Sequence, residues 1–315
     1  MRNLRIVFMG TPEFAVATLD GLVQKGYKVV GVITAPDKPS GRGRKLHESA
    51  VKRYSKEAGL YIMQPTNLKD ENFLNELRSL EANLQIVVAF RMLPKQVWSM
   101  PKYGTFNLHA SLLPDYRGAA PINWAIINGE RETGVTTFYI NEKIDTGEII
   151  LQVKTPIDPE ATAGNLHDKL MNLGSDLVLK TVSLIENNQV VTQKQPLDTI
   201  YKSADKIHRE TCKINWQKSP EEIYNHIRGL SPYPTAWAVL KNGEDLLTIK
   251  IYSARWHKEK HDLKPGTIQH TKKQLKIAVP GGFIELLELQ LPGKRKMAIG
   301  DVLNGLKIHD SAHMT

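Results

Sequence analysis

Three polar residues whose types and spacing could do chemistry are Asn107, His109 and Asp145. Asn107 and His109 are two positions apart in a run that reads as a β-strand, so both side chains leave the same face. An amide, an imidazole and a carboxylate that converge can stabilise an oxyanion and transfer protons. Taken singly, each is more often an ordinary polar residue, and an Asp before Thr146-Gly147 often makes a turn. Together with the motifs around them, they predict a catalytic site.

The elements that must position these residues follow the pattern of an α/β fold. Apolar strand-like runs alternate with helical patterns, which indicates a Rossmann-like, mostly parallel sheet with helices on both faces. Two further strands are expected to flank the Asp145 turn, and a long helix to close the domain. The expected strands are 4–9, 29–33, 84–90, 104–109, 134–140 and 148–153, and the expected helices are 14–22, 49–58, 71–80 and 163–185.

The composition of the chain changes after this long helix. Residues 186–202 are polar, and beyond them one helical pattern (220–228) is followed by short strands at 236–240, 246–254, 274–279 and 283–289. Short strands separated by Gly, Pro and Asn turns indicate a small β-barrel. We therefore predict a first domain over 1–188, a linker over 189–204 and a second domain over 205–315.

The overall composition is that of a globular protein with a basic bias. Of 315 residues, 41% are hydrophobic and 24% charged, and no apolar run approaches the roughly 20 residues that span a bilayer. The single cysteine excludes an intramolecular disulfide and fits a cytoplasmic address. No cluster of His, Cys and carboxylate residues has metal-ligand spacing, so we expect no metal. The net charge is +9, of which +6 lies in 205–315. This charge favours an anionic partner, and the alternative is a merely solvated basic surface.

A basic loop follows the second expected strand. Residues 35–45 contain two prolines and two glycines, so we expect neither helix nor strand there. We expect a mobile loop instead. The loop carries Lys38, Arg42, Arg44 and Lys45, which could bind phosphates or stack on unpaired bases. The alternative is a basic loop without a specific partner. The turn after the first strand lacks the G-x-G-x-x-G series, which disfavours an NAD-linked oxidoreductase.

At this point the chain resembles the methionyl-tRNA formyltransferase family over essentially its full length. The matching motifs are Gly-Thr-Pro-Glu-Phe-Ala at 10–15, the loop at 39–44, Asn-Leu-His-Ala-Ser-Leu-Leu-Pro at 107–114, Arg-Gly-Ala-Ala-Pro-Ile at 117–122, Ile-Asp-Thr-Gly at 144–147 and the segment 228–237. The set of Asn107, His109 and Asp145 is shared by several folate-dependent formyltransferases. The basic loop, the C-terminal barrel and the length favour the tRNA enzyme.

The resemblance implies a reaction and a set of ligands. The implied reaction transfers the formyl group of 10-formyltetrahydrofolate to the α-amino group of methionyl initiator tRNA, and an OB-like barrel helps to hold the tRNA. Ser111, Leu112, Leu113 and Pro114 match the folate-binding segment, and Arg42 matches a loop arginine that contacts the acceptor end. The segment Phe90–Pro94 departs from the family pattern because it is one residue shorter and has Arg91 in place of a glycine.

Two rival functions remain open at the level of sequence. A folate-dependent formyltransferase for a sugar nucleotide or another small amine would share Asn107, His109 and Asp145 without needing the basic loop. A non-catalytic RNA-binding protein built on a decayed enzyme domain would not need all three polar residues. Nothing in the sequence requires an oligomer, so we expect a monomer. We also expect no membrane partner, because no apolar run is long enough to span a bilayer.

Overall fold

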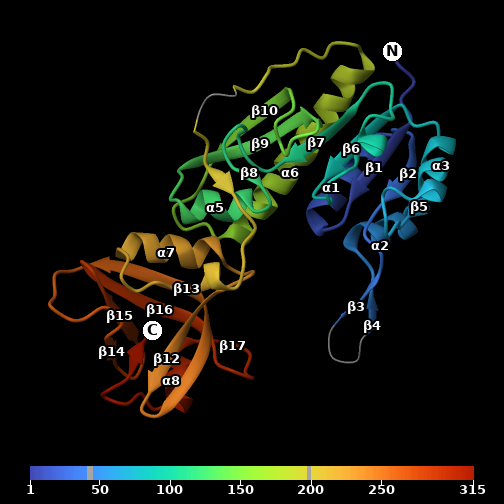
Figure 1. Cartoon of the computed structure of the whole chain (residues 1–315). Helices are drawn as coiled ribbons and strands as arrows, with labels where there is room; N and C mark the ends of the chain where they lie inside the picture. Colours follow the sequence, from blue (N-terminus) through green and yellow to red (C-terminus); the bar gives the residue numbers. More distant parts are fainter. Residues whose placement is uncertain (41–44, 197–199) are drawn as a thin grey trace. The chain divides into compact units, whose positions relative to one another are not determined.

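The computed structural model describes residues 1–40, 45–196 and 200–315, which form two compact units (Figure 1). Unit 1 comprises residues 1–118, 133–155 and 167–203. Unit 2 comprises residues 119–132, 156–166 and 204–315. Among the described residues, no helix combines the length and apolar character needed to cross a membrane.

Unit 1 is built on a seven-stranded sheet in the order β10-β9-β7-β6-β1-β2-β5. The four central strands and β5 run parallel, whereas β9 is antiparallel to β7. The strands are β1 (Ile6–Gly10), β2 (Val29–Ile33), β5 (Ile62–Met63), β6 (Leu84–Val88), β7 (Thr105–His109), β9 (Glu132–Tyr139) and β10 (Ile149–Pro156). All residues of β1 and β6 are buried, as expected for strands covered on both faces.

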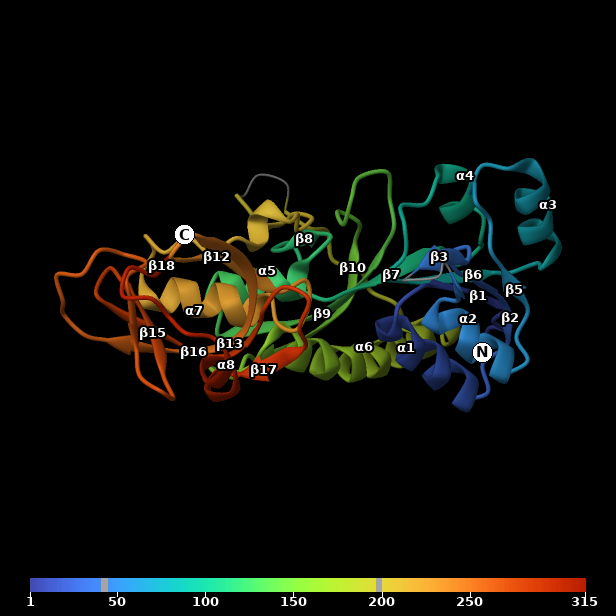
Figure 2. The same cartoon turned by 90° about the horizontal axis from the view of Figure 1, so that it is seen from below.

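The helices of unit 1 cover the two faces of this sheet (Figures 1 and 2). They are α1 (Glu13–Gln24), α2 (Ala50–Glu57), α3 (Glu71–Ser79), α4 (Lys95–Trp98) and α6 (Ala163–Glu186), the last of which begins in unit 2. Side chains of Ser49 and Asp70 cap α2 and α3 by accepting backbone N–H groups. One face of β1 packs with α3 and α4 in a cluster that includes Val7, Met9 and Leu74.

Unit 2 contains an antiparallel sheet in the order β14-β15-β16-β13-β12-β18, and β17 pairs with β16. A bridge between Thr267 and His313 joins the two ends of this series and nearly closes a barrel. The strands are β12 (Ala236–Asn242), β13 (Asp245–Lys258), β14 (Ile268–His270), β15 (Leu275–Val279), β16 (Gly282–Gln290), β17 (Lys296–Ala298) and β18 (His313–Met314). The fold class predicted from the sequence is therefore confirmed.

The helices of unit 2 are α5 (Pro121–Ile127), α7 (Pro220–Gly229), α8 (Ile299–Gly305) and the short 3-10 helix η1 (Glu210–Cys212). Helix α7 begins with a capping box in which the Ser219 hydroxyl and the Glu222 carboxylate each accept a backbone N–H of the other residue. Helix α5 packs against α7, and the Asn123 amide donates to the Gly229 carbonyl at 2.7 Å. Unit 2 therefore includes segments that the sequence placed in the first domain.

One expectation about the basic loop was wrong. Residues 38–40 and 45–47 form the short antiparallel strands β3 (Lys38–Ser40) and β4 (Lys45–His47), paired in the register Lys38 to His47. Proline is tolerated here because both strands of a two-stranded ribbon are edge strands, where a missing N–H can face solvent. The chain also has two very short strands, β8 (Arg117–Gly118) and β11 (Ser203–Ala204).

Candidate active site

Asn107 and His109 leave β7 on the face opposite to α6. Leu108, between them, points to α6, where a side chain at Gly174 would meet its Cδ2 atom at 2.7 Å. Successive side chains of a strand alternate between faces, so Asn107 and His109 share the other face. His109 is 6% exposed, whereas Asn107 is the one half-buried residue of β7. The amide of Asn107 forms no hydrogen bond within the described part of the chain, so its N–H groups can bind a substrate.

The imidazole of His109 is fixed by a backbone carbonyl. His109 Nε2 lies 2.8 Å from the carbonyl oxygen of Tyr116. A carbonyl oxygen only accepts, so Nε2 must carry the proton, and in the neutral ring Nδ1 has a lone pair. Tyr116 has a φ of +61°, a conformation that costs a non-glycine residue about 1–3 kcal/mol and recurs at functional sites. This backbone conformation directs the Tyr116 carbonyl at the ring and thereby places the proton on Nε2.

The carboxylate of Asp145 faces the Nδ1 atom of His109. Asp145 Oδ2 lies 3.8 Å from His109 Nδ1 and accepts the backbone N–H of Gly118 at 2.9 Å. The separation is longer than a hydrogen bond but short enough for a strong attraction to an imidazolium. The fold therefore brings His109 and Asp145 together, 36 positions apart in the chain.

The turn that carries Asp145 needs the residues it has. Asp145 adopts a φ of +52°, which Asp tolerates better than most residues. A side chain at Gly147 would place a Cβ atom 1.6 Å from the carbonyl oxygen of Tyr139, so only glycine fits there. The Asp-Thr-Gly sequence thus sets the direction of the carboxylate as well as a turn.

The expected folate-binding segment, Ser111 to Pro114, is held against β9 and β10. Ser111 is buried and donates its hydroxyl to the Asp115 carbonyl at 2.7 Å. Thr136 Oγ1 accepts the Leu113 N–H at 3.2 Å and donates to the Ser111 carbonyl at 2.7 Å. Leu113 packs with Phe138 and Ile149, while Leu112 and Pro114 remain half-buried. These contacts fix the backbone that follows His109.

The segment 90–94 accommodates Arg91 because its side chain binds backbone carbonyls of a neighbouring segment. The Arg91 guanidinium donates to the backbone carbonyls of Thr66, at 2.9 Å, and Pro65. It therefore ties the loop after β6 to the segment after β5. Partial desolvation of the guanidinium lowers the pKa of Arg91.

Asp37, at the base of the basic loop, is held by hydrogen bonds from two other segments. Two of the predicted functional residues of this loop lie outside the described residues. The carboxylate of Asp37 accepts hydrogen bonds from Lys52 and, at 2.9 Å, from Gln64, and the bond from Lys52 is the main cause of its lowered pKa. Lys38 is exposed at the start of β3. Of Lys45 only the backbone is described, and Arg42 and Arg44 fall in the gap.

Unit 2 presents an indole with two cations nearby. The Arg209 guanidinium carbon and Lys213 Nζ lie 5.5 and 5.7 Å from the centre of the Trp237 ring, which is half-buried on β12. The indole N–H donates to the Arg209 carbonyl at 2.8 Å, which fixes the ring. An aromatic face bordered by positive charge can take part in nucleic-acid binding.

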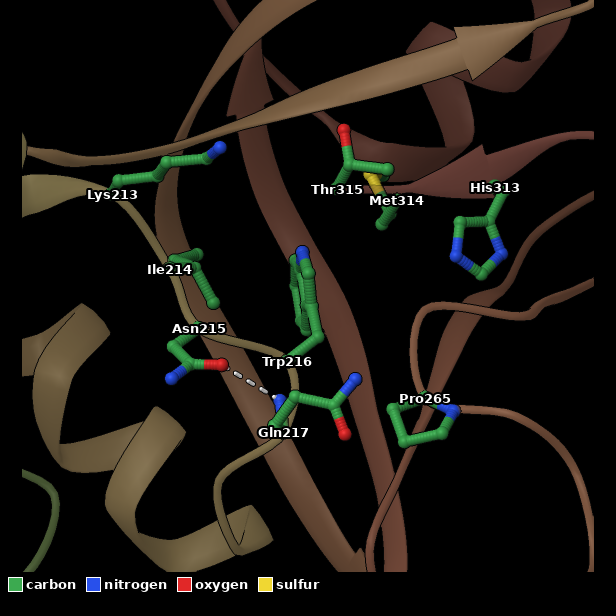
Figure 3. A pocket seen from close by; sticks show the side chains of 9 residues that line it. All are labelled: Lys213, Ile214, Asn215, Trp216, Gln217, Pro265, His313, Met314 and Thr315. Carbon is green, nitrogen blue, oxygen red and sulfur yellow. Dashed lines mark hydrogen bonds between the residues drawn. The ribbon is translucent and has the colours of Figure 1, made fainter.

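A pocket of about 370 Å³ also lies in unit 2 (Figure 3). Its lining residues are Lys213, Ile214, Asn215, Trp216, Gln217, Pro265, His313, Met314 and Thr315, and none of them is a predicted site residue. The Nε1 atom of Trp216 has no hydrogen-bond partner among the residues that the structure describes, but it is shielded from solvent, so a ligand in the pocket could not reach it. Within the described residues there is no cluster of His, Cys and carboxylate groups that could hold a metal ion.

The sequence did not single out Gln195, which lies beside Asp145. It was expected in a linker, yet its side chain is 5% exposed and donates to the Asp145 carbonyl at 3.0 Å. Gln193, two positions earlier, pairs through its backbone with Ile149 of β10. A glutamine in a polar tract carries no signal of burial, so only the structure could reveal it.

Two family models match the chain: formyl transferase over residues 4–182, and formyl transferase, C-terminal domain, over residues 206–307. Among curated relatives, the methionyl-tRNA formyltransferase of Flavobacterium johnsoniae is 59% identical over 312 residues, which cover 99% of each chain. That of Bacteroides thetaiotaomicron is 51% identical over 317 residues, which cover 99% of this chain and 98% of the relative.

Solved structures with the same fold are more distant in sequence. The sugar 3N-formyl transferase WlaRD, solved in the presence of dTDP and 5-N-formyl-THF, superposes with a TM-score of 0.65 at 24% identity and covers 94% of this chain and 100% of its own. HypX from Aquifex aeolicus, in complex with tetrahydrofolic acid, gives a TM-score of 0.66 at 16% identity. The match covers 98% of this chain and 49% of the HypX chain. At these identities the two structures support the fold alone.

Proposed function

Because the chain belongs to the methionyl-tRNA formyltransferase family, we propose that Asn107, His109 and Asp145 catalyse transfer of the formyl group of 10-formyltetrahydrofolate to the α-amino group of methionyl initiator tRNA. The observation that carries this assignment is the arrangement of His109, whose Nε2 is held by a carbonyl while Nδ1 faces a carboxylate. A merely structural histidine would need only one of these two partners.

The first chemical requirement is an oxyanion site. The neutral amine attacks the formyl carbon, and since an α-amino group titrates at about 7.7–8.0, a useful fraction is neutral without a strong base. The attack places a negative charge on the formyl oxygen. Asn107 donates to this oxygen through its unbonded amide, and His109 donates through Nδ1 when the ring is protonated. A single donor of this kind contributes about 3–4 kcal/mol of barrier lowering.

The second requirement is movement of one proton. The amine nitrogen loses a proton as the new C–N bond forms, and the folate nitrogen gains one as its bond to the formyl carbon breaks. His109 Nδ1 can accept and return this proton, and the nearby Asp145 carboxylate stabilises the imidazolium in between. His109 can therefore carry the proton from the amine to the folate nitrogen, so that no proton is gained or lost overall.

The two substrates are assigned to different parts of the chain. Ser111, Leu112, Leu113 and Pro114 are the proposed folate-binding segment, directly after His109. For tRNA we propose the basic loop residues Lys38, Arg42, Arg44 and Lys45, together with a C-terminal domain over 205–315. The exposed Lys38 and the indole of Trp237, which has two cations nearby, support nucleic-acid binding. We propose a catalytic domain over 1–188, a connecting segment over 189–204, and a monomer that acts in the cytoplasm.

The test compares acceptors and donors with the same enzyme preparation. Purified protein is given 10-formyltetrahydrofolate with methionyl initiator tRNA or with an amino-sugar nucleotide, and formylated product is measured. We expect transfer to the tRNA, and loss of at least a hundredfold in kcat in His109→Ala but not in the matched control His167→Ala, whose ring bonds to Asp168 on α6. Preferred transfer to the amino sugar would support the rival acceptor, and normal turnover in His109→Ala would refute the catalytic assignment.

A further inference from the structure

The side-chain amide of Gln195 connects two segments that meet at Asp145. Its Nε2 donates to the carbonyls of Asp145, at 3.0 Å, and Gly147, at 2.8 Å. Its Oε1 accepts from Nη2 and Nε of Arg117, at 2.6 and 3.2 Å. An amide has two N–H donors and two acceptor lone pairs, and all four are used. Gln195 therefore has a complete set of partners, and they all lie around the catalytic carboxylate.

These bonds complete a ring of contacts through the chain. Arg117 is followed by Gly118, whose N–H donates to Asp145 Oδ2. The Asp145 carbonyl and the Arg117 guanidinium are both bound by Gln195, so the backbone and the carboxylate of Asp145 are held from two sides. The Arg117 guanidinium also lies 4.7 Å from the centre of the Tyr201 ring. Two residues of the expected linker thus hold Arg117 in place.

The conformation of Asp145 needs such support. Its φ of +52° lies in the left-handed region, which is less stable for Asp than the usual conformations with negative φ. Rotation of this backbone would move the carboxylate away from His109 Nδ1. The two donors of Gln195 act on the carbonyls of Asp145 and Gly147, on either side of Thr146, and so oppose that rotation.

We propose that Gln195 is a positioning residue for formyl transfer, which acts by holding Asp145 in the conformation that faces His109. The proposal rests on the proposed catalytic role of Asp145. It assigns a function to a segment that would otherwise be only a connection. Gln195 touches neither substrate in this account, so its loss lowers kcat and leaves both Michaelis constants nearly unchanged.

The test uses the full-length protein and two variants of Gln195. Gln195→Met keeps the side-chain length and removes all four hydrogen bonds, and Gln195→Glu keeps the acceptor for Arg117 but loses both donors. We expect each to lower kcat by about tenfold or more, since two hydrogen bonds to a strained turn are lost. The matched control is Gln193→Met, because the Gln193 side chain is exposed in the same segment. Equal kcat in Gln195→Met and Gln193→Met would overturn the proposal.

A double-mutant cycle separates positioning from general loss of structure. If Gln195 acts through the Asp145 carboxylate, Gln195→Met should change kcat by less than about twofold when Asp145→Asn is already present. A further loss equal to that in the wild-type background would overturn the proposal. Should Gln195→Met fail to fold, the same cycle is run with Gln195→Glu. Normal turnover in Asp145→Asn alone would instead refute the proposed function, which keeps the two failures distinct.

Discussion

Asp145→Asn tests the electrostatic core of the site. Asparagine has the same shape as aspartate, and its Oδ1 atom can still accept the Gly118 N–H, so the turn should be preserved. The change removes only the negative charge beside His109. The carboxylate lies 3.8 Å from Nδ1, and at an effective dielectric constant of about 20 the attraction between full charges is about 4 kcal/mol.

The expected effect follows from how much of this attraction is used in the transition state. If half of a positive charge has developed on the imidazole, about 2 kcal/mol is lost, which is about thirtyfold in rate. With full proton transfer the loss is about a thousandfold. We therefore expect kcat to fall by about 30- to 1000-fold, with Michaelis constants for folate and tRNA within about threefold of wild type.

The assay is steady-state formylation of methionyl-tRNA, with single-turnover measurements to isolate the chemical step. The matched control is Glu142→Gln, which removes an exposed carboxylate that pairs with Lys95 at 2.8 Å in the same hairpin. The control should retain wild-type turnover. A kcat for Asp145→Asn within threefold of the control would refute the reasoning, because the charge would then have no role in the chemistry.

Four further predictions concern other residues of the chain. Asn107→Ala should lower kcat by about a hundredfold with little change in tRNA affinity, as measured by filter binding, because one oxyanion donor is lost. Arg42→Ala should raise the Michaelis constant for methionyl-tRNA and not for folate, and Arg42→Lys should rescue it only partly, since an ammonium lacks the planar fork; a defect confined to folate would contradict this assignment. In unit 2, Ser219→Ala should lower the free energy of unfolding by about 1 kcal/mol in urea denaturation. Hydrogen bonds from Lys218 and Ser219 lower the pKa of Glu222 from 4.5 to about 2, so its contribution is present above pH 4.5 and is lost as the pH falls toward 2. The Tm of Glu222→Gln should therefore fall less than that of wild type between these two pH values.

Local patterns in the sequence were enough for the fold class. Fully buried strands such as β1 and β6 are largely apolar in sequence, and the spacing of β7 places Asn107 and His109 on one face. These features depend on periodicities of two and 3.6 residues, which are properties of neighbouring positions. Proximity of Asp145 to His109 was expected only because His109 ends one strand and Asp145 follows another.

Tertiary structure decided what periodicity does not encode. Residues 119–132 join unit 2 because α5 packs against α7, so a cut near residue 204 would remove a partner of α5. Residues 156–166 join it through hydrogen bonds such as that from the Arg228 guanidinium to the Ala161 carbonyl. Residues 38–40 pair with residues 45–47 as strands despite Pro39, because a proline without an N–H is tolerated in an edge strand.

The tautomer of His109 and the hydrogen-bond partners of Gln195 could also not be predicted from the sequence. The first depends on the direction of one carbonyl, at Tyr116, and the second on two carbonyls and a guanidinium from other segments. Backbone groups are the same at every position, so a sequence does not mark which of them will meet a given side chain. That choice is made only when packing brings distant segments together.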